Sequence, residues 1–225
     1  TEDPAAKYAH LADPGIRAFL VAGEQLYPAD AVSFTMAEQR AFYDRYCAHF
    51  RKGRPFGLAV QDFSVGTVPC RRYVPRGAAG ASVLYLHGGG FVVGGLESHD
   101  DVCAEIADGT AAMVVAVQYR LAPEHPFPAA LDDGWAVLRH LLADGHPVVL
   151  AGDSAGGNLA AALAIRARDE GVGPIRGQVL IYPGLGGDTS QGSYVTQAHA
   201  PGLSTADVLY YRDTYKGAPH KLAEP

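Results

Sequence analysis

The sequence predicts an α/β fold in which a mostly parallel sheet is covered by helices on both faces. Short, nearly continuous apolar runs recur along the chain, and such runs are typical of strands that are buried on both faces. Segments with helical periodicity lie between these runs, so strand and helix alternate, as they do around a parallel sheet. The runs expected to form this sheet are 81–86, 113–117, 148–151 and 178–182.

Length and composition fit a single globular unit. The chain has 225 residues, of which 48% are hydrophobic and 19% are charged, and this is enough apolar material for one sizeable core. The net charge is −6, and no run of Lys and Arg is longer than Arg71-Arg72. This charge pattern argues against nucleic acid or an anionic membrane as a partner. No apolar run approaches the roughly 20 residues of a membrane-spanning helix, so we expect no membrane span.

Three cysteines, Cys47, Cys70 and Cys103, bear on the compartment and on metal binding. They are odd in number and far apart, and neither a C-x-x-C pair nor a Cys/His spacing suited to a metal occurs. We therefore expect no metal site and a reducing, cytoplasmic location. The sequence begins with Thr1 rather than Met, so export with a cleaved signal stays an open alternative.

The first fifty residues predict helices that precede every strand. Asp13 can cap a helix that begins at a proline, and the pattern Thr35-x-x-Glu38 has the form of a capping box. Gly53 is a natural terminator for the second helix. We expect 1–53 to form an N-terminal helical cap, with ordinary packing against the core as the alternative.

The remaining residues, 54–225, are expected to form the α/β core. Two alternating segments, 58–65 and 70–74, predict paired strands joined near Gly66. Helices are predicted at 98–107, 129–142, 158–166 and 205–216. The last of these lies beyond the last predicted strand, and we expect 187–217 to contribute to the cap. A surface helix packed through its tyrosines is the alternative.

Two of the predicted helices carry apolar stripes. In 129–142 the stripe comprises Leu131, Trp135, Leu138 and Leu142. In 98–107 Val102 and Ile106 are in register.

The string Gly152-x-Ser154-x-Gly156 points to a serine nucleophile. It lies between a predicted strand that ends at Ala151 and a helix rich in small residues, which is the setting of a nucleophile elbow. The serine must occupy a sharp, strained turn to project its hydroxyl, and a side chain at either glycine would collide with neighbouring backbone. The string alone can arise by chance in a chain with 27 glycines, but its strand-turn-helix setting favours the nucleophile elbow.

A second glycine string, His87-Gly88-Gly89-Gly90, predicts an oxyanion hole. It directly follows the predicted strand 81–86, where the backbone N–H groups of a glycine loop can approach a developing oxyanion. The predicted hole comprises Gly88, Gly89, Gly90 and Ala155. We expect Gly89, Gly90 and Ala155 to donate their N–H groups and Gly88 to shape the loop. His87 is expected to hold the loop by hydrogen bonds rather than to act as the base.

Three strings together resemble those of a known family. The strings 87–91, 119–133 and 152–157 are similar, in order and in spacing, to motifs of the hormone-sensitive-lipase-like (bacterial family IV) carboxylesterases of the α/β-hydrolase fold. The resemblance runs from about Phe63 to the end of the chain. It implies a carboxylic ester hydrolase that acts on short or medium acyl chains and uses no metal or organic cofactor. Within the middle string, Asp132 or Asp133 is expected to anchor adjoining structure rather than to catalyse.

The histidine and the acid that a serine nucleophile needs are not evident. The histidine takes the serine proton, the acid sets the histidine tautomer, and in this fold both follow the serine in the chain. The candidates after Ser154 are His199 and His220 as bases and Asp169, Asp188, Asp207 and Asp213 as acids. None of them lies in a string that resembles the family's acid or histidine motif. We therefore expect both partners to lie beyond Pro225.

The last predicted strand supports the same expectation. Without further strands on its outer side, 178–182 would leave an apolar edge open, and such edges invite aggregation. We expect the C-terminal strands of the sheet to be missing from this chain and to lie on a following segment or on a companion fragment. The oligomeric state stays open, with a dimer among the expected states.

Two main functions remain open at this stage. The first is hydrolysis of a small-molecule carboxylic ester by Ser154 through an acyl-enzyme, and a peptidase or amidase is a more distant variant of the same chemistry. The alternative is a catalytically inactive α/β-hydrolase-like protein that binds a small ligand in the same pocket.

Overall fold

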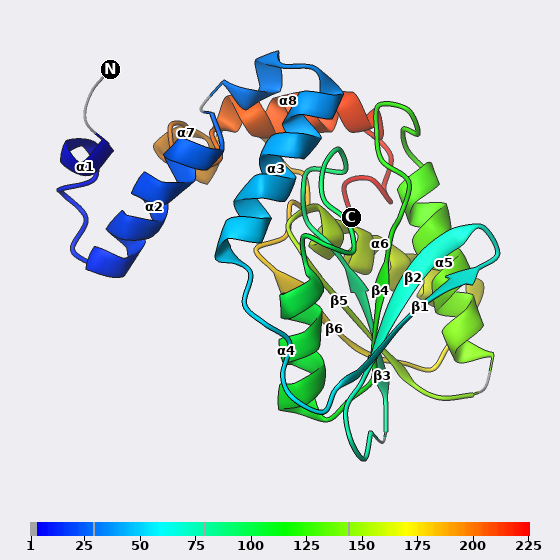
Figure 1. Ribbon diagram of the computed structural model, residues 1–225. Coiled ribbons are helices and arrows are strands. Elements are labelled where there is room, and N and C mark those ends of the chain that lie inside the picture. Colours follow the sequence, from blue (N-terminus) through cyan, green and yellow to red (C-terminus); the bar gives the residue numbers. More distant parts are fainter. Residues whose placement is uncertain (1–3, 29, 79, 144) are drawn as a thin grey trace.

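The computed structural model describes the whole chain except residues 1–3, 29, 79 and 144. The strands of the described residues are β1 (Ala59–Val65), β2 (Val68–Val74), β3 (Ser82–Leu86), β4 (Val114–Val117), β5 (Val148–Asp153) and β6 (Ile175–Ile181). They form one sheet in the order β1-β2-β4-β3-β5-β6 (Figure 1). Each predicted apolar run forms a strand, and β5 extends two residues beyond the predicted end, to Asp153.

The sheet has a parallel half and an antiparallel edge. β3 pairs in parallel with β4 and with β5, and β5 pairs in parallel with β6. β2 is antiparallel to both of its neighbours, β1 and β4. Gly66 turns the predicted hairpin between β1 and β2 with a φ of +59°, a conformation that favours glycine. The predicted mostly parallel sheet is therefore confirmed.

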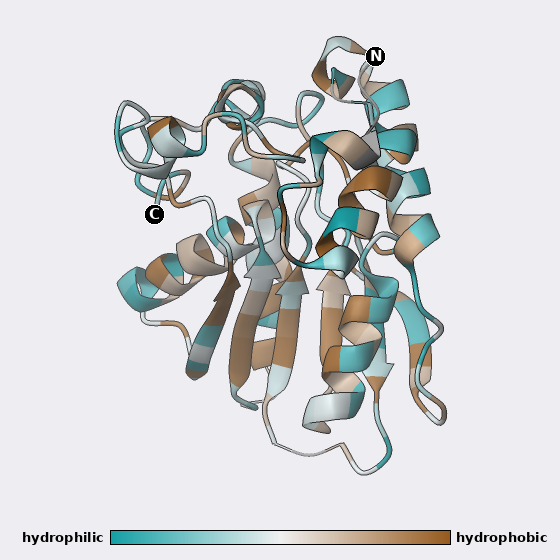
Figure 2. Ribbon diagram, turned by 90° about the vertical axis from the view of Figure 1, so that its left-hand side faces the viewer, coloured by the Kyte–Doolittle hydropathy of each residue, from teal (hydrophilic) through white to brown (hydrophobic). Residues whose placement is uncertain are grey.

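Side chains of the strands alternate between two cores, one on each face of the sheet. Along β3, Leu84 and Leu86 belong to one core, whereas Val83 and Tyr85 belong to the other. The covering helices are α4 (Asp100–Thr110), α5 (Ala129–Leu142) and α6 (Ala155–Glu170). α5 and α6 pack on the first core and α4 packs on the second. Figure 2 shows the central strands largely brown, because both of their faces are apolar.

Burial follows the predicted stripe in α5 but not in α4. All four stripe residues of α5, Leu131, Trp135, Leu138 and Leu142, are buried. The buried face of α4 instead carries Asp100, Cys103, Ala104 and Ala107, and Val102 is exposed. α4 also begins two residues later than predicted. The hydroxyl of Ser98 accepts a hydrogen bond from the N–H of Gly95 at 2.9 Å, so Ser98 belongs to the preceding loop.

The N-terminal segment is helical, as predicted. Its elements are α1 (Pro4–Lys7), α2 (Pro14–Leu26), a 3-10 helix η1 (Ala31–Ser33) and α3 (Met36–Phe50). Asp13 caps α2 by accepting from the N–H groups of Gly15 and Ile16, and Thr35 and Glu38 form the capping box of α3. Two helices follow the sheet, α7 (Ser193–Thr196) and α8 (Thr205–Tyr215). None of the helices in the described residues has both the length and the apolar character needed to cross a membrane.

α3 and α8 lie side by side beyond the carboxyl ends of the parallel strands (Figure 1). The side-chain amide of Gln39 in α3 donates to the hydroxyl of Tyr210 in α8 at 2.9 Å. The hydroxyl groups of Tyr27 and Tyr211 are 3.4 Å apart. These contacts join the two segments that are predicted to form the cap. The division into a cap and a core stays a prediction, and residues 1–3 and 29 lie outside the described residues.

β6 lies at one edge of the sheet. Most of its residues are exposed, and the side chain of Val179 is 52% exposed. The expectation of burial on both faces is confirmed for β3, β4 and nearly all of β5, and it is wrong for β6. In the described residues no further strand pairs with the outer side of β6. The open apolar edge that we expected is present in the structure.

Candidate active site

Ser154 makes the sharp turn between β5 and α6. β5 ends at Asp153 and α6 begins at Ala155, so one residue forms the connection. Its φ is +52° and its ψ is −116°, a conformation that residues other than glycine rarely adopt. The N–H of Ser154 donates to the carbonyl of Ile181 at 2.9 Å, and its carbonyl accepts from the N–H of Asn158 at 3.0 Å. The turn is therefore held from both sides.

The two glycines of the motif allow strand and helix to meet at this turn. A Cβ atom at Gly152 would lie 2.4 Å from the carbonyl carbon of Gly156. A Cβ atom at Gly156 would lie 1.9 Å from the carbonyl oxygen of Leu86 in β3. Both neighbours are backbone atoms, which cannot swing away as the end of a side chain can. The spacing of the motif is therefore a steric requirement of the turn.

Gly88 attaches the glycine loop after β3 to the end of β5. Its N–H donates to Oδ1 of Asp153 at 3.0 Å, and a Cβ atom at this position would lie 2.1 Å from Oδ2 of the same residue. Gly88 thus shapes the loop, as expected. Its N–H is engaged with Asp153, which leaves Gly89, Gly90 and Ala155 as the candidate donors of the oxyanion hole, the three that the sequence predicts.

Three backbone N–H groups remain available next to this turn. Among the described residues, the N–H groups of Gly89 and Gly90 donate no hydrogen bond. The N–H of Ala155 lies in the first turn of α6, where N–H groups have no intrahelical acceptor and the helix dipole favours negative charge. The φ angles of Gly89 and Gly90, +115° and +60°, lie in the region that favours glycine. The arrangement can bind an oxyanion.

A buried carboxylate, Asp153, connects the glycine loop to the serine turn, and the sequence did not reveal this role. Asp153 accepts hydrogen bonds from the hydroxyl of Tyr85 at 2.8 Å and from the N–H of Gly88 at 3.0 Å, and Nε2 of His99 lies 3.3 Å away. Burial opposes its ionisation, but the hydrogen bonds from His99 and Tyr85 outweigh burial and lower its pKa. A charged Asp153, the residue directly before Ser154, therefore holds Gly88 of the glycine loop next to the serine turn.

His87 is buried and supports the loop rather than the serine. Its Nδ1 lies 2.7 Å from the carbonyl oxygen of Gly88, and its ring stacks on Tyr119 with centroids 4.1 Å apart. Burial, together with the nearby His99, lowers the pKa of His87 to about 3, so its imidazole is neutral. These are the loop-holding contacts that the sequence predicted for His87.

Neither histidine that follows Ser154 contacts it in the described residues. His199 and His220 are both exposed, and the ring of His220 packs against Phe127. The side chain of Ser154 makes no capping hydrogen bond to α6. The structure therefore brings the serine and the loop N–H groups together without a base.

The candidate acids after Ser154 serve other contacts. Asp169 pairs with Arg168 and Lys221, Asp188 accepts from Ser190, Asp207 caps α8 with Ser204, and Asp213 is exposed.

Asp133 is buried and accepts from both the backbone N–H and the guanidinium of Arg120, at 2.8 Å and 3.0 Å. This is the anchoring that the sequence predicted for Asp132 or Asp133.

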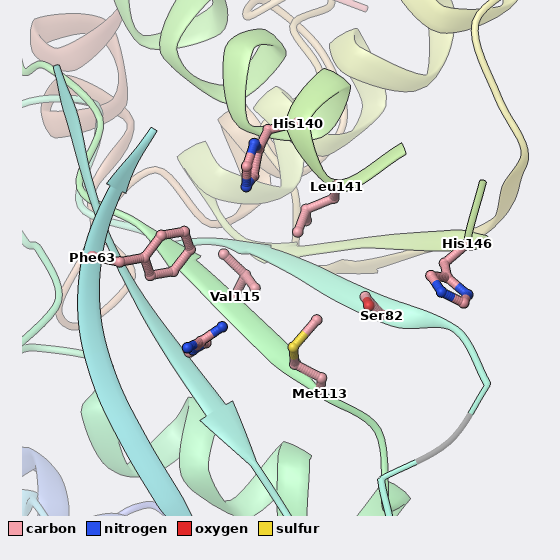
Figure 3. A pocket seen from close by; sticks show the side chains of 8 residues that line it. Phe63, Ser82, Met113, Val115, His140, Leu141 and His146 are labelled. Atoms are coloured by element: carbon pink, nitrogen blue, oxygen red, sulfur yellow. The ribbon is translucent and has the colours of Figure 1, made fainter. Parts of the chain in front are cut away.

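A cavity of about 150 Å³ lies at the opposite end of the sheet (Figure 3). Two of its lining residues, Ser82 and Met113, stand at the amino ends of β3 and β4, whereas Ser154 follows the carboxyl end of β5. The other lining residues are Phe63, Arg72, Val115, His140, Leu141 and His146. Parallel α/β sheets bind ligands at the carboxyl ends of their strands, so this cavity is not the acyl-transfer site.

Comparison with known proteins places the chain in a family. A family model described as the α/β-hydrolase fold matches residues 83–225. The chain belongs to this family. Esterase LipI of Mycobacterium tuberculosis is 46% identical to this α/β-hydrolase over 175 residues, which cover 73% of the chain and 54% of LipI. Carboxylesterase NlhH of the same species is 48% identical over 158 residues, which cover 64% of the chain and 50% of NlhH.

A solved structure narrows the relationship. The crystal structure of an esterase from the bacterial hormone-sensitive lipase family matches with a TM-score of 0.85 and 28% identity, covering 96% of this chain and 74% of that one. The predicted resemblance to hormone-sensitive-lipase-like carboxylesterases is thereby confirmed. The chain spans about half the length of the curated relatives it matches.

Proposed function

We propose that the protein carrying this chain hydrolyses carboxylic esters with Ser154 as the nucleophile. The proposal depends above all on one observation. A strained serine turn meets a loop whose N–H groups at Gly89 and Gly90 are unengaged in the described residues. The identity to two named esterases supports the same reaction.

The proposed reaction proceeds through an acyl-enzyme. Oγ of Ser154 attacks the ester carbonyl carbon while its proton passes to a histidine. The former carbonyl oxygen becomes an oxyanion, which the N–H groups of Gly89, Gly90 and Ala155 bind. Collapse of this intermediate breaks the bond to the alcohol, which leaves with the proton. Water then attacks the acyl-enzyme, the carboxylic acid is released, and Ser154 regains its proton.

The histidine and the acid are proposed to come from polypeptide that follows Pro225 in the natural protein or from a companion fragment. His199 and His220 are exposed and have no contact with Ser154 in the described residues, which supports a base from elsewhere. The open apolar edge of β6 supports the presence of further strands, since an unpaired edge of this kind otherwise invites aggregation.

The proposed substrates are small esters with short or medium acyl chains. The expectation comes from the resemblance to the carboxylesterases. A cap formed by 1–53 and 187–217 supports a pocket of limited length, because α8 approaches the site closely. A Cβ atom at Gly90 would lie 2.4 Å from the ring of Tyr211 in α8.

A cytoplasmic location and a dimeric state belong to the same proposal. All three cysteines, Cys47, Cys70 and Cys103, are free thiols, which supports a reducing compartment. A dimer would use the outer edge of the strands that are proposed to follow β6, since that edge would be free to pair with a second copy.

The second candidate function is ligand binding without catalysis on the same fold. The observation that favours it is that no histidine contacts Ser154 in the described residues. Such a protein would bind a small ester or acid beside Gly89 and Gly90 without hydrolysing it.

Hydrolysis of p-nitrophenyl esters by the natural-length protein separates the two functions. We expect the acetate and butyrate to be cleaved faster than long-chain esters and a p-nitroanilide to be cleaved poorly. Ser154→Ala is expected to lower kcat by at least about 10³-fold, and the surface variant Ser190→Ala to leave it unchanged. No hydrolysis by the wild-type protein, combined with saturable binding of the same esters, would favour the ligand-binding function.

A further inference from the structure

A single cap arginine, Arg40 in α3, reaches the glycine loop of the proposed oxyanion hole. Its Nε donates to the carbonyl oxygen of Val92 at 2.9 Å, and its Nη2 donates to the carbonyl oxygen of Ala122 at 3.1 Å. Val92 belongs to the loop that follows Gly90, and Ala122 belongs to the loop that follows β4. Both residues are fully buried. In the described residues neither carbonyl has another hydrogen-bond donor.

The orientation of this guanidinium is set by a carboxylate. Nη1 and Nη2 of Arg40 donate to the two oxygens of Glu124 at 3.0 Å and 2.6 Å, which is the bidentate geometry of a planar fork. The hydrogen bond from Arg40 also holds the pKa of Glu124 below its usual range. With two of its nitrogens fixed in this way, the guanidinium directs Nε at Val92. A lysine has one ammonium and cannot serve three acceptors in a plane.

The two loops that Arg40 joins are also bonded to each other. The N–H of Ala122 donates to the carbonyl of Phe91 at 2.9 Å. The N–H groups of Val92 and Val93 both donate to the carbonyl of Gly89 at 3.0 Å. These bonds form a turn that orients the peptide groups of Gly89 and Gly90. The carbonyl of Val92, at the end of this turn, accepts the hydrogen bond from Arg40.

We propose that Arg40 is a positioning residue through which the cap helix α3 fixes the N–H groups of Gly89 and Gly90 in their oxyanion-binding orientation. The inference depends on the proposed ester hydrolysis. Arg40 touches no reacting atom and acts through the carbonyls of Val92 and Ala122. Its loss leaves two buried carbonyls without a donor, so the loop relaxes and the N–H groups turn away from the oxyanion. Displacements of about 1 Å in such groups can cost on the order of 10²-fold in rate.

The test compares four variants of the natural-length protein with p-nitrophenyl acetate. Arg40→Met is expected to lower kcat by roughly 10- to 100-fold with KM nearly unchanged, because oxyanion binding is realised only in the transition state. Arg40→Lys is expected to recover part of this loss. Glu124→Gln keeps one acceptor for the guanidinium and is expected to lower kcat by less than Arg40→Met does, because the orientation of Arg40 is only partly lost. Arg45→Met is the matched control, since Arg45 lies on the same helix, is exposed and rests over the ring of Phe42.

Competent sites are counted by fluorophosphonate labelling to completion, so that kcat refers to folded protein. Amide hydrogen exchange of residues 88–95 is expected to be faster in Arg40→Met than in Arg45→Met. If Arg40→Met retains wild-type kcat per labelled site, or if its loss equals that of Arg45→Met, the inference is wrong while the proposed function stands. A wild-type protein that neither labels nor hydrolyses overturns the proposed function and this inference with it.

Discussion

At the scale of single residues, the strained turn at Ser154 is possible because the positions two before and two after it are glycines. Gly152 and Gly156 face backbone atoms at distances that no Cβ atom can occupy. The string that contains them was recognisable in the sequence because this steric requirement acts over five consecutive positions. Tyr85 and His99 were not recognisable as partners of Asp153, because they lie 68 and 54 residues away along the chain. Only the folded sheet brings them together.

The steric requirement at Gly156 predicts a large loss of stability for Gly156→Ala. The added methyl would lie 1.9 Å from the carbonyl oxygen of Leu86, so β3 and α6 must separate. We expect the free energy of unfolding to fall by about 3 kcal/mol, measured by urea denaturation. Gly109→Ala in α4 is the control, because nothing lies within 4 Å of its added methyl. It is expected to be neutral or to stabilise by up to about 1 kcal/mol. Equal effects of the two substitutions would contradict the steric account.

His87 predicts a specific dependence of stability on pH. In the unfolded chain its pKa is 6.5, whereas in the fold burial lowers the pKa to about 3. Between these values the unfolded state binds more protons, so the free energy of unfolding decreases as pH falls. One such group contributes about 1.4 kcal/mol per pH unit in this window.

His87→Asn is expected to remove this contribution, and its amide can still donate to the carbonyl of Gly88. Between pH 7 and pH 4 the free energy of unfolding, measured by denaturation, should fall more steeply with decreasing pH in the wild type than in the variant. The exposed His146 offers a control, and His146→Asn should follow the wild-type curve. A constant difference between His87→Asn and wild type across this range would show that His87 is not held neutral by burial.

At the scale of elements, prediction from sequence succeeded where neighbouring residues determine the outcome. The stripe of α5 was correct because four large apolar residues recur at helical spacing. In α4 the prediction was correct for Ile106, which packs against the second core, and wrong for Val102, which is exposed. This helix also buries Asp100, which accepts hydrogen bonds from residues far away in the chain, Arg54, Arg71 and Tyr73. β6 has the composition of a central strand and, within the described residues, has no strand on its outer side, as expected from the sequence.

The open edge of β6 predicts self-association of the 225-residue chain. Val179 is 52% exposed on a strand with an unpaired side, whereas Val195 in α7 is similarly exposed, at 56%, but lies in a helix. We expect Val179→Lys to shift the sedimentation profile toward monomer, because a charge on an edge strand opposes pairing with another strand. Val195→Lys adds the same charge and should leave the profile unchanged. An equal shift in both variants would assign the effect to net charge instead of to the strand edge.

At the scale of the whole molecule, the topology gathers the proposed site from distant parts of the chain. The glycine loop follows β3, Ser154 follows β5, and both strands are parallel neighbours, so their carboxyl ends meet at one edge. α3 and α8 cover this edge, and Arg40 and Tyr211 contact the glycine loop from these two helices. The serine and the loop were predictable because each carries its own motif. The contacts that α3 and α8 make with the loop were not predictable, because they depend on how helices pack over the sheet.

The central claim is that Ser154 is the nucleophile of this assembly, and covalent labelling tests it most directly. The natural-length protein is treated with a fluorophosphonate, and the adduct is located by mass spectrometry of its peptides. The account predicts one adduct per chain, on Ser154, with loss of ester hydrolysis in proportion to labelling and no adduct in Ser154→Ala. An adduct on another residue, or undiminished hydrolysis by Ser154→Ala, would contradict it.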